Sequence, residues 1–144
     1  MSETITLGFV CVQNAGRSQM ATAFAEAERS NRKLEDEVEI VTGGTHPADS
    51  VHEIVIEVMA ETGYDLSDRT PRAISDGELA ACDIVATMGC STLELEAEAE
   101  TETELRDWAL EDPDGADIDT ARRIRDTVEE RVKRLFDDVE AASA

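Results

Sequence analysis

The chain alternates short β-prone segments with segments of helical periodicity, and this alternation limits its possible folds more than any other feature. The expected strands span residues 5–10, 38–41, 83–88 and 107–110. The expected helices span residues 18–32, 50–62, 76–80 and 119–139. Strands that alternate with helices are typical of a parallel sheet covered on both faces. Because 144 residues is the usual length of one domain, we expect residues 1–144 to form a single α/β domain.

The composition is strongly acidic, with 34 Asp and Glu residues against 13 Lys and Arg residues and a formal net charge of −21. Nucleic acids and anionic membranes are bound by basic faces, so we expect neither as a partner. Of the basic residues, 11 are arginine and only 2 are lysine. Acidity with scarce lysine indicates a halophilic source with a salty cytoplasm, where a Debye length of about 3 Å at molar salt screens surface repulsion.

The sequence shows no sign of secretion or membrane insertion. No apolar run approaches the ~20 residues that cross a bilayer. Residues 4–12 are apolar but lack the basic flank of a signal peptide. We therefore expect a cytoplasmic protein, and we expect its three cysteines to be reduced thiols rather than a disulfide framework.

A run of alternating glutamates marks residues 93–105. As a strand, this segment would place six like charges on one face. As a helix, it would place like charges four residues apart, which is also unfavourable. We expect a mobile, solvated acidic loop with no catalytic part.

A nucleophile and an anion cradle are predicted in the segment that joins the first strand to the first helix. Cys11 follows the strand, and Arg17 and Ser18 lie at the start of the helix. Backbone N–H groups of a loop that leads from a strand into a helix converge on an anion and also favour a thiolate. Arg17 adds a planar fork for two oxyanion oxygens, and Ser18 can donate to the thiolate. The residues expected to hold the oxyanion are Val12, Gln13, Asn14, Ala15, Gly16 and Arg17.

These motifs resemble a known family. Cys11-x5-Arg17-Ser18 resembles the low-molecular-weight tyrosine phosphatase fold, and Gln19-Met20-Ala21 resembles the arsenate reductases on that fold. Matches continue over nearly the whole chain, at Gly44-Thr45-His46-Pro47, Thr87-Met88-Gly89-Cys90 and Asp107-Trp108-Ala109-Leu110-Glu111-Asp112-Pro113. The last two look most like arsenate reductases that use a small external thiol. The resemblance implies a single-domain, four-stranded parallel sheet flanked by helices.

The resemblance gives Asp112 a catalytic role. Taken alone, Asp112-Pro113 would be interpreted as a turn. In the family, the carboxyl group at this position protonates the leaving oxygen, and expulsion of hydroxide or alkoxide does need a positioned acid. Asp114 is the nearby alternative.

The chain departs from the family pattern in four respects. Gln13 stands where the family usually has glycine, and Gly16 stands where thioredoxin-coupled reductases have a second loop cysteine. Those reductases also have a cysteine several residues beyond the one that resembles Cys90, and residues 91–104 contain none here. Thr22 stands where some relatives have an acid that helps to bind potassium, so we expect no metal site.

The other two cysteines are expected to differ in role. Cys90 follows the third strand as Cys11 follows the first, so parallel strands would bring both thiols to one edge of the sheet, although Cys90 can also be read as a turn residue. Cys82 precedes the third strand and would lie roughly 26 Å from Cys90 in an extended chain. A disulfide needs Cα atoms within about 7 Å. We therefore expect Cys82 to serve packing.

The remaining candidates point to no further chemistry. His46 and His52 are the only histidines, and they lack metal-ligand spacing, so we expect both to be structural or solvated. Trp108 is expected in the core.

Three functions fit these residues. The first is an arsenate reductase without a bound cofactor, in which the Cys11 thiolate attacks arsenate, Asp112 assists, and a second thiol resets the enzyme. That thiol is either Cys90 or an external reductant, namely a small thiol with a glutaredoxin-like protein, or thioredoxin. The second is a low-molecular-weight protein tyrosine phosphatase that forms a cysteinyl phosphate. Cys90 and Gln19-Met20 favour the reductase, and five aromatic residues are few for a phosphotyrosine pocket. The third is a non-enzymatic oxyanion sensor.

The acidic composition predicts that salt stabilises this protein. Between dilute buffer and molar KCl, the thermal midpoint of unfolding should rise, because salt screens repulsion among the excess acids. Thermal unfolding followed by circular dichroism measures this change. Equal stability at the two salt concentrations would contradict the halophilic interpretation.

Overall fold

Four strands form one parallel sheet in the order β2-β1-β3-β4. The computed structural model describes residues 4–11, 13–44, 46–88, 104–108, 110 and 115–143. The strands are β1 (Ile5–Cys11), β2 (Val38–Gly44), β3 (Ile84–Thr87) and β4 (Glu104–Asp107). This arrangement confirms the predicted α/β fold with a four-stranded parallel sheet.

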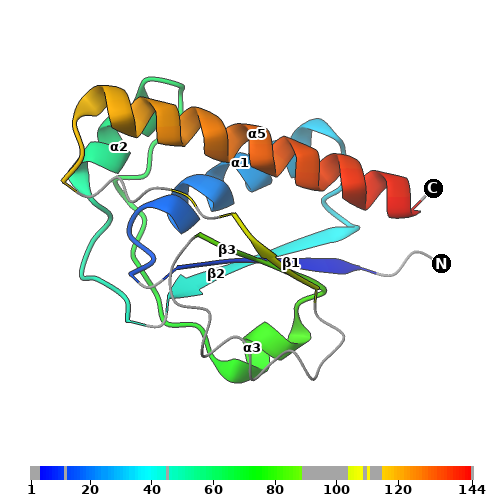
Figure 1. Cartoon of the computed structure of the whole chain (residues 1–144). Coiled ribbons are helices and arrows are strands. Elements are labelled where there is room, and N and C mark those ends of the chain that lie inside the picture. The colour runs from blue at the N-terminus through cyan, green and yellow to red at the C-terminus, as the bar shows by residue number, and fades with distance from the viewer. Residues whose placement is uncertain are drawn as a thin grey trace.

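Helices cover both faces of the sheet (Figure 1). They are α1 (Arg17–Asn31), α2 (Glu53–Ala60), α3 (Asp76–Ala81) and α5 (Ile118–Ser143). Helices α1, α2 and α5 lie on one face, and α3 lies on the other. The apolar stripe of α5 enters the core, where Val128, Val132 and Phe136 are fully buried. None of the helices in the described ranges has both the length and the apolarity that a membrane span requires.

Pairing with neighbouring strands moves two predicted boundaries. The second strand was expected to end at residue 41, but Thr42 and the two glycines after it continue β2 because this strand pairs with β1 as far as Cys11 and Gly44. The fourth strand was expected at residues 107–110, but it begins at Glu104, where the backbone N–H donates to the carbonyl of Asp83. The expectation of an acidic loop over residues 93–105 is therefore wrong for its last two residues. Residues 93–103 lie outside the described residues.

Trp108 is in the core, as predicted. It is 7% exposed, its backbone N–H donates to the carbonyl of Thr87, and its ring centroid lies 6.0 Å from that of Phe9. Trp108 is thus fixed against the sheet immediately beyond the carboxyl ends of β3 and β4.

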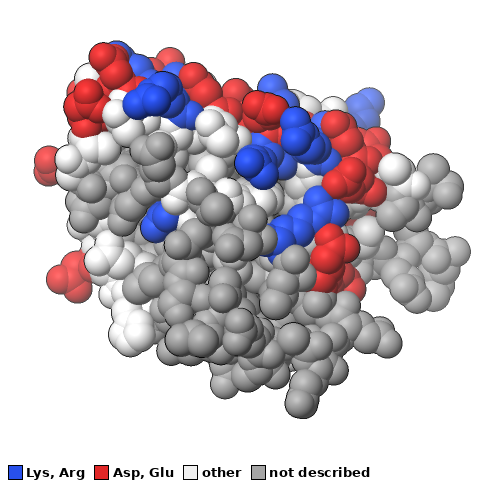
Figure 2. All heavy atoms as spheres, in the orientation of Figure 1, with Lys and Arg blue, Asp and Glu red and all other residues white. Residues whose placement is uncertain are grey.

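Ion pairs connect α5 to its surroundings. Arg122 and Arg125 of α5 both bind the carboxylate of Glu61, the residue after α2, at 2.7 and 2.9 Å. Arg106 of β4 binds Asp138 of α5 at 2.8 Å. Figure 2 shows acidic and basic side chains interleaved along the edge of this face where α5 runs. The basic residues of the chain are thus largely used to neutralise neighbouring acids.

The carboxyl end of β2 meets the segment before α3 at an unusually close approach. A Cβ atom added to Gly43 would lie 2.6 Å from the Cβ atom of Ile74 and 3.0 Å from its backbone nitrogen. The absence of a side chain allows two hydrogen bonds to form, from the Gly44 N–H to the Arg72 carbonyl at 2.9 Å and from the Ile74 N–H to the Gly44 carbonyl at 3.2 Å. Gly43 therefore sets the position of the segment that carries Arg72.

Gly43→Ala should destabilise the protein by about 1–3 kcal/mol, because the new methyl group overlaps backbone and Cβ atoms that cannot rotate away. Chemical denaturation measures the change. Gly77→Ala in α3 is the matched control, since its added Cβ would meet nothing closer than the Ser75 hydroxyl at 3.9 Å. The control should be neutral or slightly stabilising, because alanine favours a helix over glycine. Equal effects of the two substitutions would contradict the close-approach argument.

Candidate active site

The predicted loop lies at the carboxyl edge of the sheet. Cys11 is the last residue of β1, and α1 begins at Arg17. The loop residues from Gln13 to Gly16 are described, and Val12 lies outside the described residues. Ligands of open α/β sheets bind at this edge. The Cys11 side chain is 4% exposed, so its sulfur is held inside the loop rather than on the surface.

Asn14 is buried at the centre of this loop with a left-handed backbone. Its φ angle is +52°, a region that asparagine tolerates better than most residues do. The orientation of its amide is fixed by the backbone of Arg72, whose N–H can only donate and lies 3.0 Å from Asn14 Oδ1. Gln19 Nε2 donates to the same oxygen at 3.1 Å and to the Asn14 carbonyl at 3.0 Å. The Nδ2 group of Asn14 must therefore point the other way.

That orientation sets the direction of the next hydrogen bonds. Asn14 Nδ2 donates to Ser18 Oγ at 2.7 Å and to Thr42 Oγ1 at 2.9 Å. Thr42 in turn donates to the carbonyl of Phe9 at 3.0 Å. Because Ser18 Oγ accepts from Asn14, its own proton is left for Cys11 Sγ, which lies 2.9 Å away. The Asn14 N–H donates to the same sulfur at 3.1 Å. Two donors thus converge on Cys11, an arrangement that favours a thiolate.

The start of α1 faces the same loop. Gly16 is the N-cap residue, and no side-chain cap occupies this end among the described residues. The first turn contains no acidic side chain, whereas most helices use an oxygen there to satisfy the free N–H groups. An oxyanion in the loop would take the place of such a cap.

Backbone and side-chain hydrogen bonds hold the loop from the side of α2. The N–H of Ala48 donates to the carbonyl of Gln13 at 3.0 Å, and the N–H of His52 donates to the carbonyl of Ala15 at 2.9 Å. Gln13 is exposed, and its Oε1 lies 3.1 Å from His52 Nε2. The glutamine that departs from the family pattern is therefore accommodated at the rim, and His52 has a structural role.

Arg17 joins the loop to the other half of the sheet edge. Its Nη1 donates to the carbonyl of Met88, just after β3, and to the carbonyl of Leu110, after β4, at 2.7 Å. These bonds hold the guanidinium at the carboxyl ends of the strands, where the loop amides also lie. The binding of two oxyanion oxygens by this guanidinium stays a prediction.

Three candidate site residues lie outside the described residues, namely Asp112, Asp114 and Cys90. Cys82 is buried on the face that carries α3, where its sulfur would lie 2.9 Å from a Cβ atom on Gly8, which agrees with a packing role. The described residues contain no group of His, Cys, Asp or Glu that could hold a metal ion.

Sequence reasoning missed three residues that shape the loop: Gln19, Thr42 and Arg72. Gln19 was marked only by the resemblance, and Thr42 lay just beyond the expected end of the second strand. Arg72 acts through its backbone N–H, which every residue except proline has, so no residue type marks the position. These contacts span up to 58 positions in sequence and follow from the sheet register rather than from a local motif.

Iodoacetamide should discriminate between the two described cysteines. Burial, and next the charges of Asp83 and Glu78, raise the pKa of the Cys82 thiol to about 11, so it should react only after unfolding. Cys11, with two hydrogen-bond donors on its sulfur, should react in the folded protein, and phosphate or arsenate should protect it. Peptide mapping by mass spectrometry measures both. Modification of Cys82 before Cys11, or no protection by oxyanion, would contradict the proposed cradle.

Comparisons with known proteins agree with this geometry. A family model described as low molecular weight phosphotyrosine protein phosphatase matches residues 6–144. A Halobacterium salinarum protein named "Putative arsenate reductase" is 67% identical over 135 residues, which cover 94% of this chain and 93% of that protein. A Synechocystis protein named "Glutaredoxin arsenate reductase" is 34% identical over 129 residues, which cover 89% of this chain and 93% of that protein.

Solved structures give the same assignment. A structure described as an arsenate reductase in the phosphate binding state superposes with a TM-score of 0.79 at 30% identity, covering 94% of this chain and 98% of that one. A Corynebacterium glutamicum thioredoxin-dependent arsenate reductase superposes with a TM-score of 0.74 at 28% identity, covering 98% of this chain and 64% of that one. The chain therefore belongs to the low molecular weight phosphotyrosine protein phosphatase family.

Proposed function

We propose that this protein is an arsenate reductase that captures arsenate on the sulfur of Cys11. The observation that carries the capture step is the pair of hydrogen bonds that Ser18 and the Asn14 N–H direct at Cys11 Sγ, at the entrance to a helix without a side-chain cap. A thiolate and an anion are thereby favoured in the same place. The 67% identity with the Halobacterium salinarum protein supports reduction of arsenate as the activity.

In the first step, arsenate binds to the N–H groups of the loop residues Val12 to Gly16 and to the guanidinium of Arg17. Cys11 Sγ attacks arsenic, a sulfur–arsenic bond forms, and one arsenic–oxygen bond breaks. Asp112 is proposed to give its proton to the departing oxygen, which leaves as water. Preorganised donors in a water-poor loop stabilise the charge that shifts onto the oxygens.

In the second step, a thiolate attacks the sulfur of the Cys11 adduct. A sulfur–sulfur bond forms, the sulfur–arsenic bond breaks, and its electron pair goes to arsenic, which leaves as arsenite. The thiol is either Cys90, followed by an external dithiol protein such as thioredoxin, or a small cellular thiol followed by a glutaredoxin-like protein. The relatives named for glutaredoxin and thioredoxin support a thiol reductant in general.

A phosphatase is the second candidate, because phosphate and arsenate are nearly isosteric and the same loop would form a cysteinyl phosphate that water hydrolyses. A related solved structure described in a phosphate binding state supports binding of phosphate by this type of loop. We expect residual phosphatase activity even in a reductase.

Comparison of two reactions tests the proposal. Arsenite production is measured with glutathione and glutaredoxin, or with thioredoxin, and hydrolysis of p-nitrophenyl phosphate is measured separately. Arsenate turnover should exceed ester hydrolysis, and Cys11→Ser should abolish both. Hydrolysis without arsenite production would establish the phosphatase instead. Binding of phosphate by the native protein without either reaction would indicate an oxyanion sensor.

Cys90→Ser separates the two routes of reduction. If the small-thiol route operates, the variant should reduce arsenate at a normal rate with glutathione and glutaredoxin, because no internal disulfide is needed. If Cys90 is the resolving thiol, the variant should instead accumulate a Cys11 adduct that intact-protein mass spectrometry detects. Cys82→Ser is the matched control and should turn over normally in either case, since Cys82 is buried at the end of α3 beside Leu79 and Val85.

A further inference from the structure

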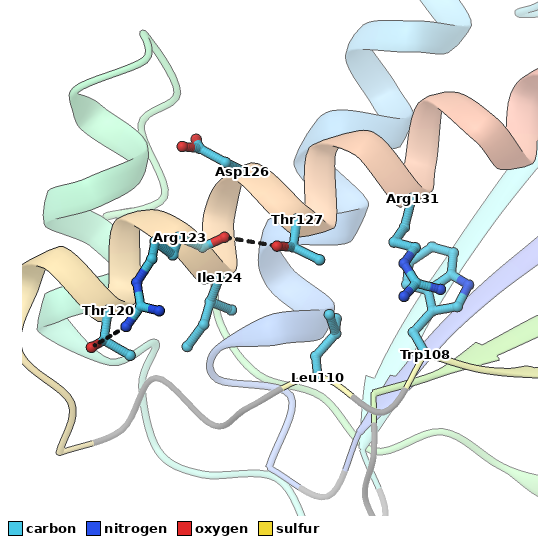
Figure 3. Close-up of a pocket in the computed structure, with 8 residues that line it drawn as sticks. All are labelled: Trp108, Leu110, Thr120, Arg123, Ile124, Asp126, Thr127 and Arg131. Carbon is cyan, nitrogen blue, oxygen red and sulfur yellow. Dashed lines mark hydrogen bonds between the residues drawn. The ribbon is translucent and has the colours of Figure 1, made fainter.

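A groove of about 480 Å³ runs between the start of α5 and the segment after β4. Its apolar floor consists of Trp108, Leu110 and Ile124. Figure 3 shows Arg131 reaching from α5 toward Trp108 at one end, and Arg123 with Thr120 at the other. This volume is within the range that holds a small-molecule ligand, about 300–1,000 Å³.

Arg123 and Arg131 differ from most arginines of this chain in their ion pairing. Seven arginines bind a carboxylate within 4.0 Å, namely Arg32, Arg69, Arg72, Arg106, Arg122, Arg125 and Arg134. No such ion pair is present at Arg123 or Arg131 in the part of the chain that the structure describes. Both side chains are exposed, and the chain has 34 acids for 13 bases. Two guanidiniums on one groove, with no carboxylate paired to them among the described residues, therefore indicate a binding site for an external anion.

Among the described residues, the acids near the groove have other partners. Asp126 lines the groove, but it binds Arg125 Nε at 3.0 Å and points away from the floor in Figure 3. Asp117 is within electrostatic range of Arg123, yet its pKa is lowered chiefly by hydrogen bonds from Thr120. Thr120 Oγ1 accepts from Arg123 Nη2 at 3.1 Å, which holds that guanidinium at the groove.

The groove is adjacent to the candidate active site. Leu110, part of its floor, accepts a hydrogen bond from Arg17 through its carbonyl. Trp108, also in the floor, packs against Phe9 of the strand that ends at Cys11. A ligand in the groove would thus lie against the residue that anchors Arg17.

We propose that this groove binds the carboxylates of a small peptide-like thiol that reduces the Cys11–arsenic adduct. This inference rests on the proposed function, which needs a thiol at this edge of the sheet. Guanidinium groups pair with carboxylates in a planar, bidentate manner. A protein of net charge −21 repels anionic thiols in general, so a local pair of arginines would be needed to attract one. An extended tripeptide spans about 10 Å, so its thiol stays within that distance of the carboxylates held in the groove.

The bound thiol would act as a two-electron donor together with Cys11. Its thiolate attacks Cys11 Sγ, a mixed disulfide forms, and the electron pair of the sulfur–arsenic bond reduces arsenic from the +5 to the +3 state. Arsenite leaves after it takes up a proton. A second thiol then attacks the mixed disulfide, so that Cys11 is released as a thiolate and a disulfide of the two external thiols departs.

Reductant kinetics on the full chain test the groove. Arsenate turnover is measured against glutathione, which carries two carboxylates, and against uncharged 2-mercaptoethanol at the same salt concentration. The double variant R123Q/R131Q should raise the KM for glutathione about tenfold or more, the loss of one to two charge-assisted contacts, and should leave the KM for 2-mercaptoethanol within twofold. R134Q is the charge-matched control on the same helix, since Arg134 pairs with Glu130 outside the groove, and it should change neither value.

Binding of S-methylglutathione, which cannot react, separates this inference from the proposed function. Calorimetry without arsenate should show saturable binding to the parent and to R134Q and none to R123Q/R131Q. Absence of binding to the parent, or equal binding by all three proteins, would overturn the groove proposal while arsenate turnover could still stand. Binding at the groove by a protein that does not reduce arsenate would reject the proposed function and retain the anion site.

Discussion

The orientation of one buried amide, that of Asn14, determines the direction of the hydrogen bond between Ser18 and Cys11. Because Asn14 Nδ2 donates to Ser18 Oγ, the hydroxyl proton of Ser18 is directed at the sulfur. The Arg72 backbone N–H can only donate, so it assigns Asn14 Oδ1 as an acceptor and Nδ2 as a donor. Ser18 then has its proton free to turn toward sulfur. If this amide were reversed, two N–H donors would face each other at Arg72, and the arrangement around Cys11 would favour a thiol instead.

This dependence connects the loop chemistry to the packing of the sheet. Arg72 reaches Asn14 because the segment before α3 lies against the end of β2, and it lies there because Gly43 has no side chain. The segment that contains Arg72 is also fixed to α3 by the ion pair between Arg72 and Glu78. A hydrogen bond from Arg72 is the main cause of the lowered pKa of Glu78. A substitution at Gly43 should therefore alter the chemistry of Cys11 through the hydrogen bond between Arg72 and Asn14.

The features that depend on neighbouring residues in the chain could be predicted from the sequence. The features that depend on how the strands pair with one another could not. Cys11 at a strand end and Arg17 at a helix start follow from one contiguous segment, so the loop could be located. The end of β2 at Gly44 and the start of β4 at Glu104 are decided by pairing with β1 and β3, which overrides turn-like composition and alternating charge. The partners of Asn14 were missed for the same reason, since they come from three separate segments. Trp108 was predicted correctly because a lone tryptophan in a small domain has few places other than the core.

The choice between reductase and phosphatase does not lie in the loop. Both reactions begin with attack by Cys11 on a tetrahedral oxyanion, and the donors that stabilise the first adduct serve phosphorus and arsenic alike. The outcomes diverge afterwards, because water suffices to release phosphate from sulfur, whereas release of arsenite needs two electrons from a thiol. Selection for arsenate chemistry must therefore act on residues that admit and orient a thiol, outside residues 11–17. In a chain with this excess of acids, such selection would be visible at exposed arginines next to the anchor of Arg17 that pair with no carboxylate in the described part of the chain.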